Sequence, residues 1–395
     1  MNKNNRIIVL GAGVLGLAVA IKLRELKYKN IIICEKEADV GVHASGRNSG
    51  VLHAGIYYTS ETQKARFCLE GNQAWKSFCK EHKLPLLECG KTLVARHAQD
   101  LEQLHIIYDR AIENGTAVQW LSEEYLKFKE PLAKTYQKAL WVEDTAVVDS
   151  RAILKKMKSI LIEDGVDFHF NCRFLKKTSQ SEISTSLGHF EFDYLINAAG
   201  AFSDKIAHDF NVAKHLRLIP FQGLYYELSS MLSSKINSHI YPVPDLRNPF
   251  LGIHFTKSIT GKVYLGPTAI PAFGPEQYGL GTGFFNKEMP KIVLSDILLF
   301  LKNKKFRSVA LSEPKYYLKH FFHKKAAELV TQLDSKEILP TSKIGIRPQL
   351  VNWQTKELMM DFHLEKTNDS LHILNAISPA FTCALPFASF ICKQI

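Results

Sequence analysis

The chain has 395 residues, of which 46% are hydrophobic and 23% charged, as is usual for globular proteins with room for two domains. The formal net charge of +11 favours anionic partners but does not select among nucleic acid, anionic lipid and acidic metabolites. The seven cysteines are dispersed without a C-x-x-C pair. This pattern argues against a zinc site or a disulfide framework and favours a reducing compartment. We expect no metal site.

Two further features suggest a location in the cell. The first predicted strand begins at about residue 6, which leaves no room for a signal or transit peptide. No apolar run approaches the roughly 20 residues of a membrane span. We therefore expect a cytoplasmic protein.

The N-terminal segment predicts a strand–turn–helix–strand unit. Arg6-Ile7-Ile8-Val9-Leu10 is typical of a buried strand, and Gly11-Ala12-Gly13-Val14-Leu15-Gly16 follows it directly. Apolar residues at helical spacing come next, and then a second apolar run, Asn30-Ile31-Ile32-Ile33-Cys34, which leads to Glu35. In such a unit Gly11 allows the tight turn, Gly13 lets the backbone approach a pyrophosphate, and Gly16 lets the helix pack closely on the strand.

Glu35 makes this unit specific for a dinucleotide. It lies 19 residues after Gly16, where its carboxylate can accept hydrogen bonds from both ribose hydroxyls. The helix N-terminus offers N–H groups and a positive dipole end to the diphosphate. An acid at this position disfavours a 2′-phosphate, so NADP fits worst. A tight turn that binds nothing is the structural alternative.

The rest of the chain indicates an α/β fold whose nucleotide-binding domain is interrupted by an insertion. A helix at 150–164, a strand at 166–170 and a strand that ends at Asn197-Ala198-Ala199-Gly200 resume the first sheet. Between 216 and 270 the pattern changes to antiparallel strands. We predict a Rossmann-like FAD-binding domain that is discontinuous in sequence (1–85, 145–215 and 340–395). The inserted substrate domain has an antiparallel sheet and comprises 86–144 and 216–339.

A polar loop after Glu35 favours flavin over nicotinamide. Residues 42–58 are rich in Gly, Ser and Asn in their first half, so the loop can run extended beside a long cofactor and offer backbone amides to it. A nicotinamide enzyme has no need of a second cradle. An ordinary turn-rich connection is the alternative interpretation.

These motifs resemble the D-amino-acid oxidase superfamily of FAD enzymes and, within it, the L-2-hydroxyglutarate dehydrogenase/oxidase family. The superfamily is indicated by the glycine motif with Glu35, by Asn197-Ala198-Ala199-Gly200 and by Gly345-Ile346-Arg347-Pro348. The narrower family is indicated by residues 45–58, 220–228, 249–256 and 265–267. The chain departs from the family pattern at Arg47, Pro348 and Phe381, and these departures bear on the substrate.

The resemblance implies FAD-dependent oxidation of a 2-hydroxy acid, most simply L-2-hydroxyglutarate to 2-oxoglutarate, by hydride transfer to flavin N5. An amine or amino-acid oxidase of the same superfamily is the alternative. The expected electron acceptor is a quinone or oxygen. The motifs and the resemblance together place FAD contacts at Gly11, Gly13, Val14, Leu15, Gly16, Glu35, Lys36, Ser45, Arg47, Asn48, Ser49, Gly50, Ala199, Gly200, Ala380, Phe381 and Thr382.

Oxidation of a hydroxy acid needs a base for the hydroxyl proton and a cation for the carboxylate. His53, just beyond the cofactor loop, is the first choice as base, and His254 competes with it. Arg347 offers a bidentate fork to the carboxylate, and Tyr57 is a weaker candidate for a substrate contact. A dicarboxylate needs a second cation, for which Lys64, Arg66 and Lys262 are open candidates. Each of these side chains also has a structural interpretation as a packed or ion-paired residue.

The basic, apolar segment 287–325 allows a different partner. It holds ten Lys or Arg against three acids, interleaved with runs such as Ile297-Leu298-Leu299-Phe300-Leu301. Such a segment can lie on an anionic membrane, which for this protein would be the cytoplasmic face of the inner membrane. Helices with solvated basic faces over a core are the alternative. A nucleic-acid-binding protein is a third reading of the charge, but we find no nucleic-acid motif and expect no nucleic-acid partner.

Overall fold

The computed structural model describes residues 2–246, 251–279 and 288–395. The chain forms two compact units, and each is built from separated segments. Unit 1 comprises 1–48, 150–220 and 346–395, and unit 2 comprises 49–149 and 221–345. The units divide at residues 149/150, 220/221 and 345/346, and the predicted domain boundaries are 145, 215 and 340. Residues 49–85, however, belong to unit 2 rather than to the nucleotide-binding segments, because α3 and the short strands around it bond within unit 2.

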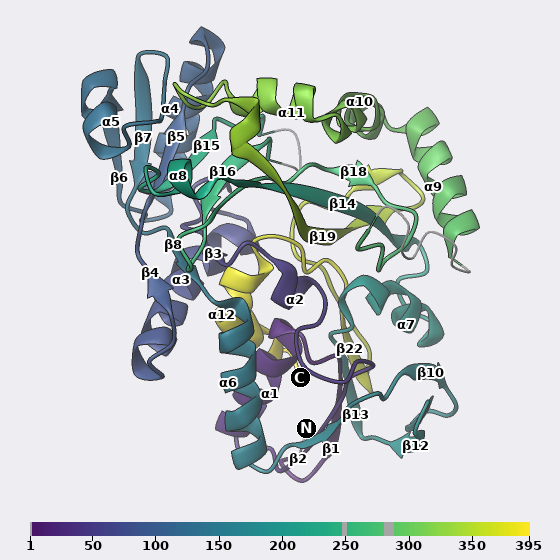
Figure 1. The fold of residues 1–395 in the computed structure, drawn as a ribbon. Coiled ribbons are helices and arrows are strands. Elements are labelled where there is room, and N and C mark those ends of the chain that lie inside the picture. Colours follow the sequence, from purple (N-terminus) through teal and green to yellow (C-terminus); the bar gives the residue numbers. More distant parts are fainter. Residues whose placement is uncertain (1, 247–250, 280–287) are drawn as a thin grey trace. The chain divides into compact units, whose positions relative to one another are not determined.

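Unit 1 contains a six-stranded sheet in the order β21-β22-β13-β1-β2-β9. Figure 1 labels β22, β13, β1 and β2 of this sheet. Its strands are parallel except for β21, which runs antiparallel to β22. The elements of unit 1 are β1 (Arg6–Leu10), α1 (Val14–Glu25), β2 (Asn30–Cys34), α2 (Ala44–Arg47), α6 (Ser150–Glu163), β9 (Asp167–His169), β10 (Phe174–Lys177), β11 (Glu182–Thr185), β12 (Gly188–Glu191), β13 (Tyr194–Asn197), η1 (Gly200–Phe202), α7 (Ser203–Asp209), β20 (Glu357–Leu358), β21 (Leu364–Lys366), β22 (Ser370–Ile373) and α12 (Ala380–Cys392).

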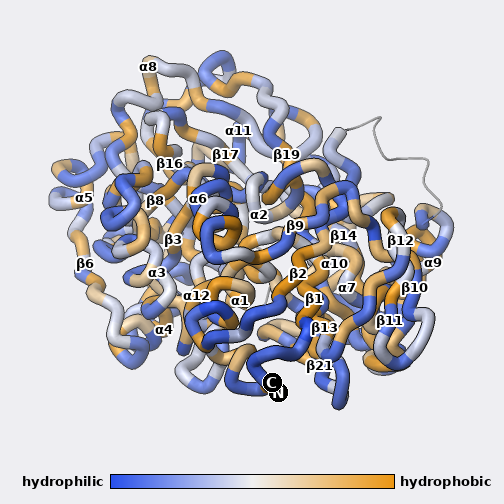
Figure 2. Tube along the Cα trace, turned by 90° about the horizontal axis from the view of Figure 1, so that it is seen from below, coloured by the Kyte–Doolittle hydropathy of each residue, from blue (hydrophilic) through white to orange (hydrophobic). Residues whose placement is uncertain are grey.

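The central strands of this sheet are buried on both faces, so their sequences are continuously apolar rather than alternating. Residues 7–10 of β1 are all buried, and Figure 2 shows β1 and β2 as hydrophobic segments. Helices α1, α6 and α12 pack together beside the sheet. The helix predicted at 150–164 and the strand predicted at 166–170 are confirmed as α6 and β9.

Unit 2 is built on a larger sheet with the order β14-β17-β16-β15-β5-β7-β6. The pairs of this sheet with a described register are antiparallel except β15 with β5, which is parallel. Its elements are β3 (Val51–Leu52), α3 (Gln63–Glu81), β4 (Leu86–Leu87), β5 (Lys91–Val94), α4 (Ala98–Glu113), β6 (Val118–Ser122), α5 (Glu123–Lys129), β7 (Lys138–Val142), β8 (Ala146–Val148), α8 (Ser230–Ser233), β15 (His239–Pro242), β16 (His254–Lys257), β17 (Val263–Gly266), β18 (Ile270–Pro271), α9 (Met289–Lys302), α10 (Lys304–Ser312), η2 (Pro314–Tyr317), α11 (Lys319–Ala326) and η3 (Ser335–Glu337).

The chain passes between the units four times, twice within long strands. Strand β14 (Leu216–Leu228) contains the division at residue 220, and β19 (Ile338–Asn352) contains the division at residue 345. The antiparallel region predicted for 216–270 is confirmed, because β14 and β16 both pair with β17 in antiparallel orientation. Within this region β16 begins at His254, and residues 247–250 lie outside the described part.

Side chains alternate between the two faces of the unit 2 sheet, because successive residues of a strand point in opposite directions. Residues such as Val94, Ile240, Phe255 and Leu265 form a core with Phe322 of α11 on one face, which we call the aliphatic face. Leu93, Leu140, Val142 and Tyr241 pack on the other face with α4 residues. Among the described residues no helix is long and apolar enough to cross a membrane.

Candidate functional site

The turn between β1 and α1 has the conformation that its glycines predict. Gly11 has φ +102°, and a Cβ there would lie 2.7 Å from the Ala198 carbonyl oxygen. A Cβ on Gly16 would lie 1.9 Å from the carbonyl oxygen of Gly11. Both distances are shorter than any real Cβ contact, so the close packing of helix on strand depends on these glycines.

Glu35 directly follows β2, and its side chain is only 8% exposed. Its Oε2 accepts a hydrogen bond from the Ala12 N–H at 2.7 Å, and its Oε1 accepts one from the Glu37 N–H at 2.9 Å. The carboxylate therefore braces the glycine turn, a contact that sequence reasoning did not anticipate. A carboxylate has about four acceptor positions, so these two bonds leave capacity for ribose hydroxyls.

The segment after Glu35 differs from the extended loop that we expected. Residues 44–47 form the short helix α2, in which the N–H groups of Gly46 and Arg47 donate to the His43 carbonyl. The Ser45 hydroxyl accepts a hydrogen bond from the Val14 N–H at 3.0 Å, at the first residue of α1. The Asn48 amide donates to the Ser45 carbonyl at 2.6 Å. The helix thus places Ser45 beside the N-terminus of α1.

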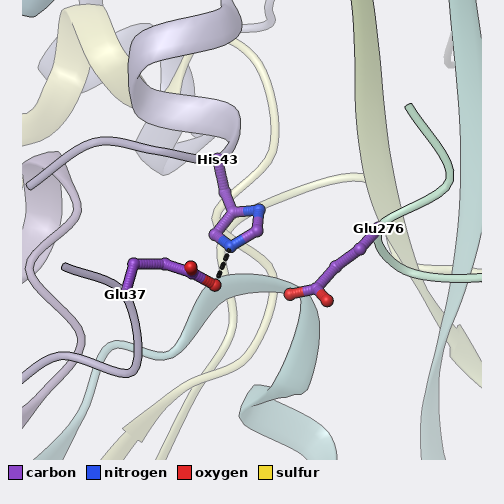
Figure 3. Close-up of side chains that lie close together, drawn as sticks. All are labelled: Glu37, His43 and Glu276. Carbon is purple, nitrogen blue, oxygen red and sulfur yellow. Dashed lines mark hydrogen bonds and ion pairs between the residues drawn. The ribbon is translucent and has the colours of Figure 1, made fainter. Parts of the chain in front are cut away.

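A charged cluster lies next to this segment. Figure 3 shows the His43 imidazole turned towards the Glu37 carboxylate, with 2.8 Å between Nε2 and Oε1. The Lys36 ammonium contacts the same carboxylate and lies 2.8 Å from His43 Nε2. Hydrogen bonds from Lys36 first, and from His43 second, lower the pKa of Glu37 to about 2. Glu37 is therefore ionised at neutral pH. It pairs with the ammonium of Lys36, a residue that we predict to contact the cofactor.

Two further expected cofactor segments lie in unit 1. Asn197 ends β13, where its amide nitrogen donates to the Ser203 carbonyl at 2.8 Å and its Oδ1 accepts from the Ala199 N–H at 3.2 Å. Gly200 has φ +56°, and a Cβ there would meet no heavy atom within 4 Å. Helix α12 begins at Ala380, so Ala380, Phe381 and Thr382 belong to its first turn, and Thr382 is buried.

Ser49, Gly50, His53 and Tyr57 belong to unit 2. Gly50 has φ +74°, and its carbonyl accepts from the Val148 N–H at 2.9 Å. The carbonyl of His53 accepts from the Asn72 amide at 3.2 Å, which fixes the backbone under this half-buried imidazole. The Tyr57 hydroxyl is buried and has no hydrogen-bond partner among the described residues. Burial raises the pKa of Tyr57 well above its ordinary value.

His254 is oriented by two contacts. Its ring lies 3.9 Å, centroid to centroid, from that of Tyr241, and its Nδ1 lies 2.7 Å from the Gly252 carbonyl oxygen. A carbonyl only accepts, so Nδ1 carries the proton and, in the neutral ring, Nε2 is the acceptor nitrogen. His254 is the first residue of β16.

The candidate cations differ in their surroundings. Arg347 is a half-buried residue of β19, in the part of that strand that belongs to unit 1. Lys262 is exposed and pairs with Glu227 at 2.9 Å, whereas Arg66 is exposed and Lys64 is buried near the Tyr58 ring. Sequence reasoning missed a fifth cation, Lys91, which is fully buried in β5. The only available signal was a lysine at the start of an apolar strand.

The sequence model of the FAD-dependent oxidoreductase family matches residues 6–391. The chain belongs to this family. Among curated relatives, L-2-hydroxyglutarate dehydrogenase of Escherichia coli is 32% identical, and the match covers 98% of this chain and 92% of the relative. The enzyme of the same name from Indibacter alkaliphilus is 31% identical, with 98% of both chains covered. The human mitochondrial enzyme of that name is 29% identical, with 98% of this chain and 88% of the relative covered.

Solved structures confirm the α/β fold class. L-α-glycerophosphate oxidase from Mycoplasma pneumoniae with FAD bound superposes with a TM-score of 0.75 at 21% identity, covering 100% of this chain and 94% of that chain. Glycine oxidase from Geobacillus kaustophilus gives 0.71 at 15% identity, with 99% and 94% covered. FAD is the cofactor of the family to which this chain belongs. The glycine turn and the acceptor capacity of Glu35 fit a dinucleotide of this kind.

Proposed function

We propose that the protein oxidises L-2-hydroxyglutarate to 2-oxoglutarate. The observation that carries this proposal is the near full-length similarity to several L-2-hydroxyglutarate dehydrogenases. The turn at Gly11 and the position of Glu35 support it, because a flavin enzyme needs a dinucleotide site. When bound, FAD supplies the acceptor for the hydride that leaves C2 of the substrate.

Different residues bind the cofactor, orient the substrate and remove its hydroxyl proton. In unit 1 the N-terminus of α1 would bind the diphosphate and Glu35 would hold the ribose, while Ser45 and Arg47 of α2, and Asn48 directly after it, would contact the rest of the cofactor. Arg347 orients the carboxylate next to the reacting carbon by a bidentate contact. His53 takes the hydroxyl proton, and His254 is the competing base because its Nε2 is an acceptor. The residues expected near the flavin also include Ser49, Gly50, Ala199, Gly200 and 380–382.

The substrate assignment is tested by anaerobic mixing of the purified holoenzyme with L- and D-2-hydroxy acids and with amino acids. We expect rapid loss of the oxidised flavin band with L-2-hydroxyglutarate and much slower loss with its D-enantiomer, since one carbon face is presented to the flavin. Bleaching by an amino acid alone would instead identify an amino-acid oxidase of the same superfamily. Purified protein that takes up no FAD would contradict the whole proposal.

We also propose that electrons pass to a membrane quinone and that the protein, in the cytoplasm, docks on the anionic face of the inner membrane. The exposed apolar residues of helix α9 support membrane docking. Leu294, Ile297 and Leu301 lie three and four residues apart, so they share one helix face, and they are 59%, 51% and 62% exposed. Basic residues 302, 304, 305 and 307 follow directly. Exposed apolar side chains beside positive charge are typical of membrane-surface helices. Lys287 at the start of the predicted segment lies outside the described residues.

Vesicle sedimentation tests the docking surface. We expect the holoenzyme to sediment with vesicles that contain phosphatidylglycerol, and less so with pure phosphatidylcholine or at high salt. Replacing Leu294, Ile297 and Leu301 together by glutamine should abolish sedimentation without changing turnover with a soluble dye. Leu175→Gln, at a 56% exposed position of unit 1, is the control. Equal sedimentation of the triple variant and the wild type would exclude α9 as the docking surface.

A further inference from the structure

Lys91 is a fully buried lysine that the proposed mechanism does not use. It begins β5, its side chain is 0% exposed, and its Nζ has no hydrogen-bond partner within the described parts of the chain. The ammonium lies 4.7 Å from the centroid of the Tyr57 ring and 5.3 Å from that of Tyr241. Aromatic faces attract a cation, but they offer it no acceptor. A buried ammonium is costly unless an anion or an acceptor meets it.

The strand register shows that Lys91 is part of a larger polar group. Lys91 pairs with His239, and the pairing of Ile240 with Phe255 brings Tyr241 opposite His254. Paired residues and residues two apart in a strand share a face. A polar row therefore crosses the sheet on the face opposite the aliphatic face. Its members are Lys91, His239, Tyr241, His254 and Thr256.

Three buried polar atoms, two in the polar row and one on the adjacent Tyr57, lack hydrogen-bond partners among the described residues. The Tyr57 hydroxyl and the Thr256 hydroxyl are buried without a hydrogen bond to any described residue, as is Lys91 Nζ. Such orphaned groups are uncommon in native proteins and mark sites where a further molecule completes the bonds. A cation 4.7 Å from the ring of a tyrosine whose hydroxyl has no partner among the described residues offers the charge and the donor that a carboxylate site needs.

Lys91 and His239, the paired residues of the polar row, differ in the charge that they carry. Burial lowers the pKa of Lys91 to about 7, and the nearby Cys68 side chain opposes that shift. Burial, followed by the charge of Lys91, lowers the pKa of His239 to about 3. His239 Nδ1 accepts from the Lys257 N–H at 3.2 Å, as a neutral ring does. Lys91 is therefore the positive member of the polar row, and an incoming anion would favour its protonated form.

We propose that Lys91, with the Tyr57 hydroxyl, binds the distal carboxylate of the dicarboxylic hydroxy acid. This inference rests on the proposed function, whose substrate carries two carboxylates. It assigns the second cation that a dicarboxylate needs. Lys262, in contrast, is exposed and paired with Glu227.

Lys91→Met tests the assignment because methionine keeps the length and removes the charge. The substrates are L-2-hydroxyglutarate and L-2-hydroxypentanoate, which has a methyl group in place of the distal carboxylate. We expect kcat/KM for the dicarboxylate to fall about 10- to 100-fold, mainly through KM, while the value for the monocarboxylate stays within about twofold. Tyr57→Phe should show the same selectivity more weakly. Lys138→Met, at the exposed first residue of β7 near the Trp120 ring, is the matched control.

Stability and ligand binding separate this role from a structural one. Methionine suits a buried site better than an unpaired ammonium, so the Tm of Lys91→Met holoenzyme should equal or exceed that of the wild type. The folded pKa of about 7 is below the ordinary 10.5, so the unfolded chain binds more protons and wild-type stability should rise from pH 7 to pH 9. The groups that face Lys91 are Cys68, His239, Tyr57 and Tyr241. Lys91→Met should lose this rise.

A binding measurement keeps the two proposals distinguishable. Glutarate, which cannot be oxidised, should perturb the flavin spectrum of the wild type, and Lys91→Met should need at least about tenfold more glutarate but no more pentanoate. If the wild type oxidises neither hydroxy acid, the proposed function fails, and selective loss of glutarate binding still supports Lys91. Equal losses for both ligands or both substrates, or a lower Tm without selectivity, would overturn the inference.

Discussion

Gly16→Ala is expected to destabilise unit 1 and to abolish FAD retention. The added Cβ would lie 1.9 Å from the Gly11 carbonyl oxygen. This atom belongs to the backbone of the turn, so no flexible side chain can move aside, and α1 must shift away from β1. Forced overpacking of this kind costs about 3 kcal/mol, and the shift also displaces the N–H groups of α1 from the diphosphate. Denaturant unfolding and the flavin-to-protein absorbance ratio of the purified variant measure the two effects.

Glu25→Ala is the control for this prediction. It also places alanine in α1, but at an exposed position where only the Lys22 ion pair of 2.8 Å is lost. An exposed pair of this type contributes less than about 1 kcal/mol, so FAD content should not change. Wild-type stability and flavin content in Gly16→Ala would show that the turn tolerates a Cβ and that its geometry does not govern cofactor binding.

His53→Asn is expected to slow flavin reduction by L-2-hydroxyglutarate about 10²- to 10⁴-fold, the range typical of a lost general base. Asparagine preserves a polar side chain of similar reach but cannot take the hydroxyl proton. Stopped-flow reduction at saturating substrate isolates this step from reoxidation. The wild-type rate should fall towards acidic pH as the base becomes protonated, and this decline should be absent in the variant.

His254→Asn decides between the two histidines. If His53 is the base, the His254 variant should mainly raise KM, because its ring stacks on Tyr241 and lies within the polar row. A large loss of the reduction rate confined to His254→Asn would transfer the role of base to His254. His189→Asn, on exposed strand β12, should behave as the wild type in both measurements.

The parts of the fold that follow local rules could be predicted from the sequence. The tight turn at Gly11 and the close packing at Gly16 follow from glycine spacing, and the buried central strands follow from continuous apolar runs. Helix α6 follows from its apolar period. The short helix α2 was missed because four residues carry no detectable period, and the Ser45 hydroxyl bond to Val14 joins residues 31 positions apart.

The surroundings of individual charges depend on pairing that one sequence does not reveal. Lys91 precedes three apolar or neutral residues and could equally have been an exposed strand end. Its burial results from being flanked by β15 and β7, and these strands come from distant segments of the chain. The same holds for Glu35, whose bond to the Ala12 N–H uses a carboxylate that the motif assigns to ribose. Cofactor and substrate roles of the site residues stay predictions until the variants are measured.

The two faces of the unit 2 sheet should differ in how they tolerate substitution. Positions such as Val94, Ile240 and Phe255 are surrounded by hydrocarbon, so a library there would be filtered by volume and mostly return conservative replacements. The opposite face holds Lys91 and the Tyr57 and Thr256 hydroxyls, whose polar atoms have no hydrogen-bond partner among the described residues. Selection for thermostability alone should therefore repeatedly replace these residues with apolar ones, and selection for activity should restore them.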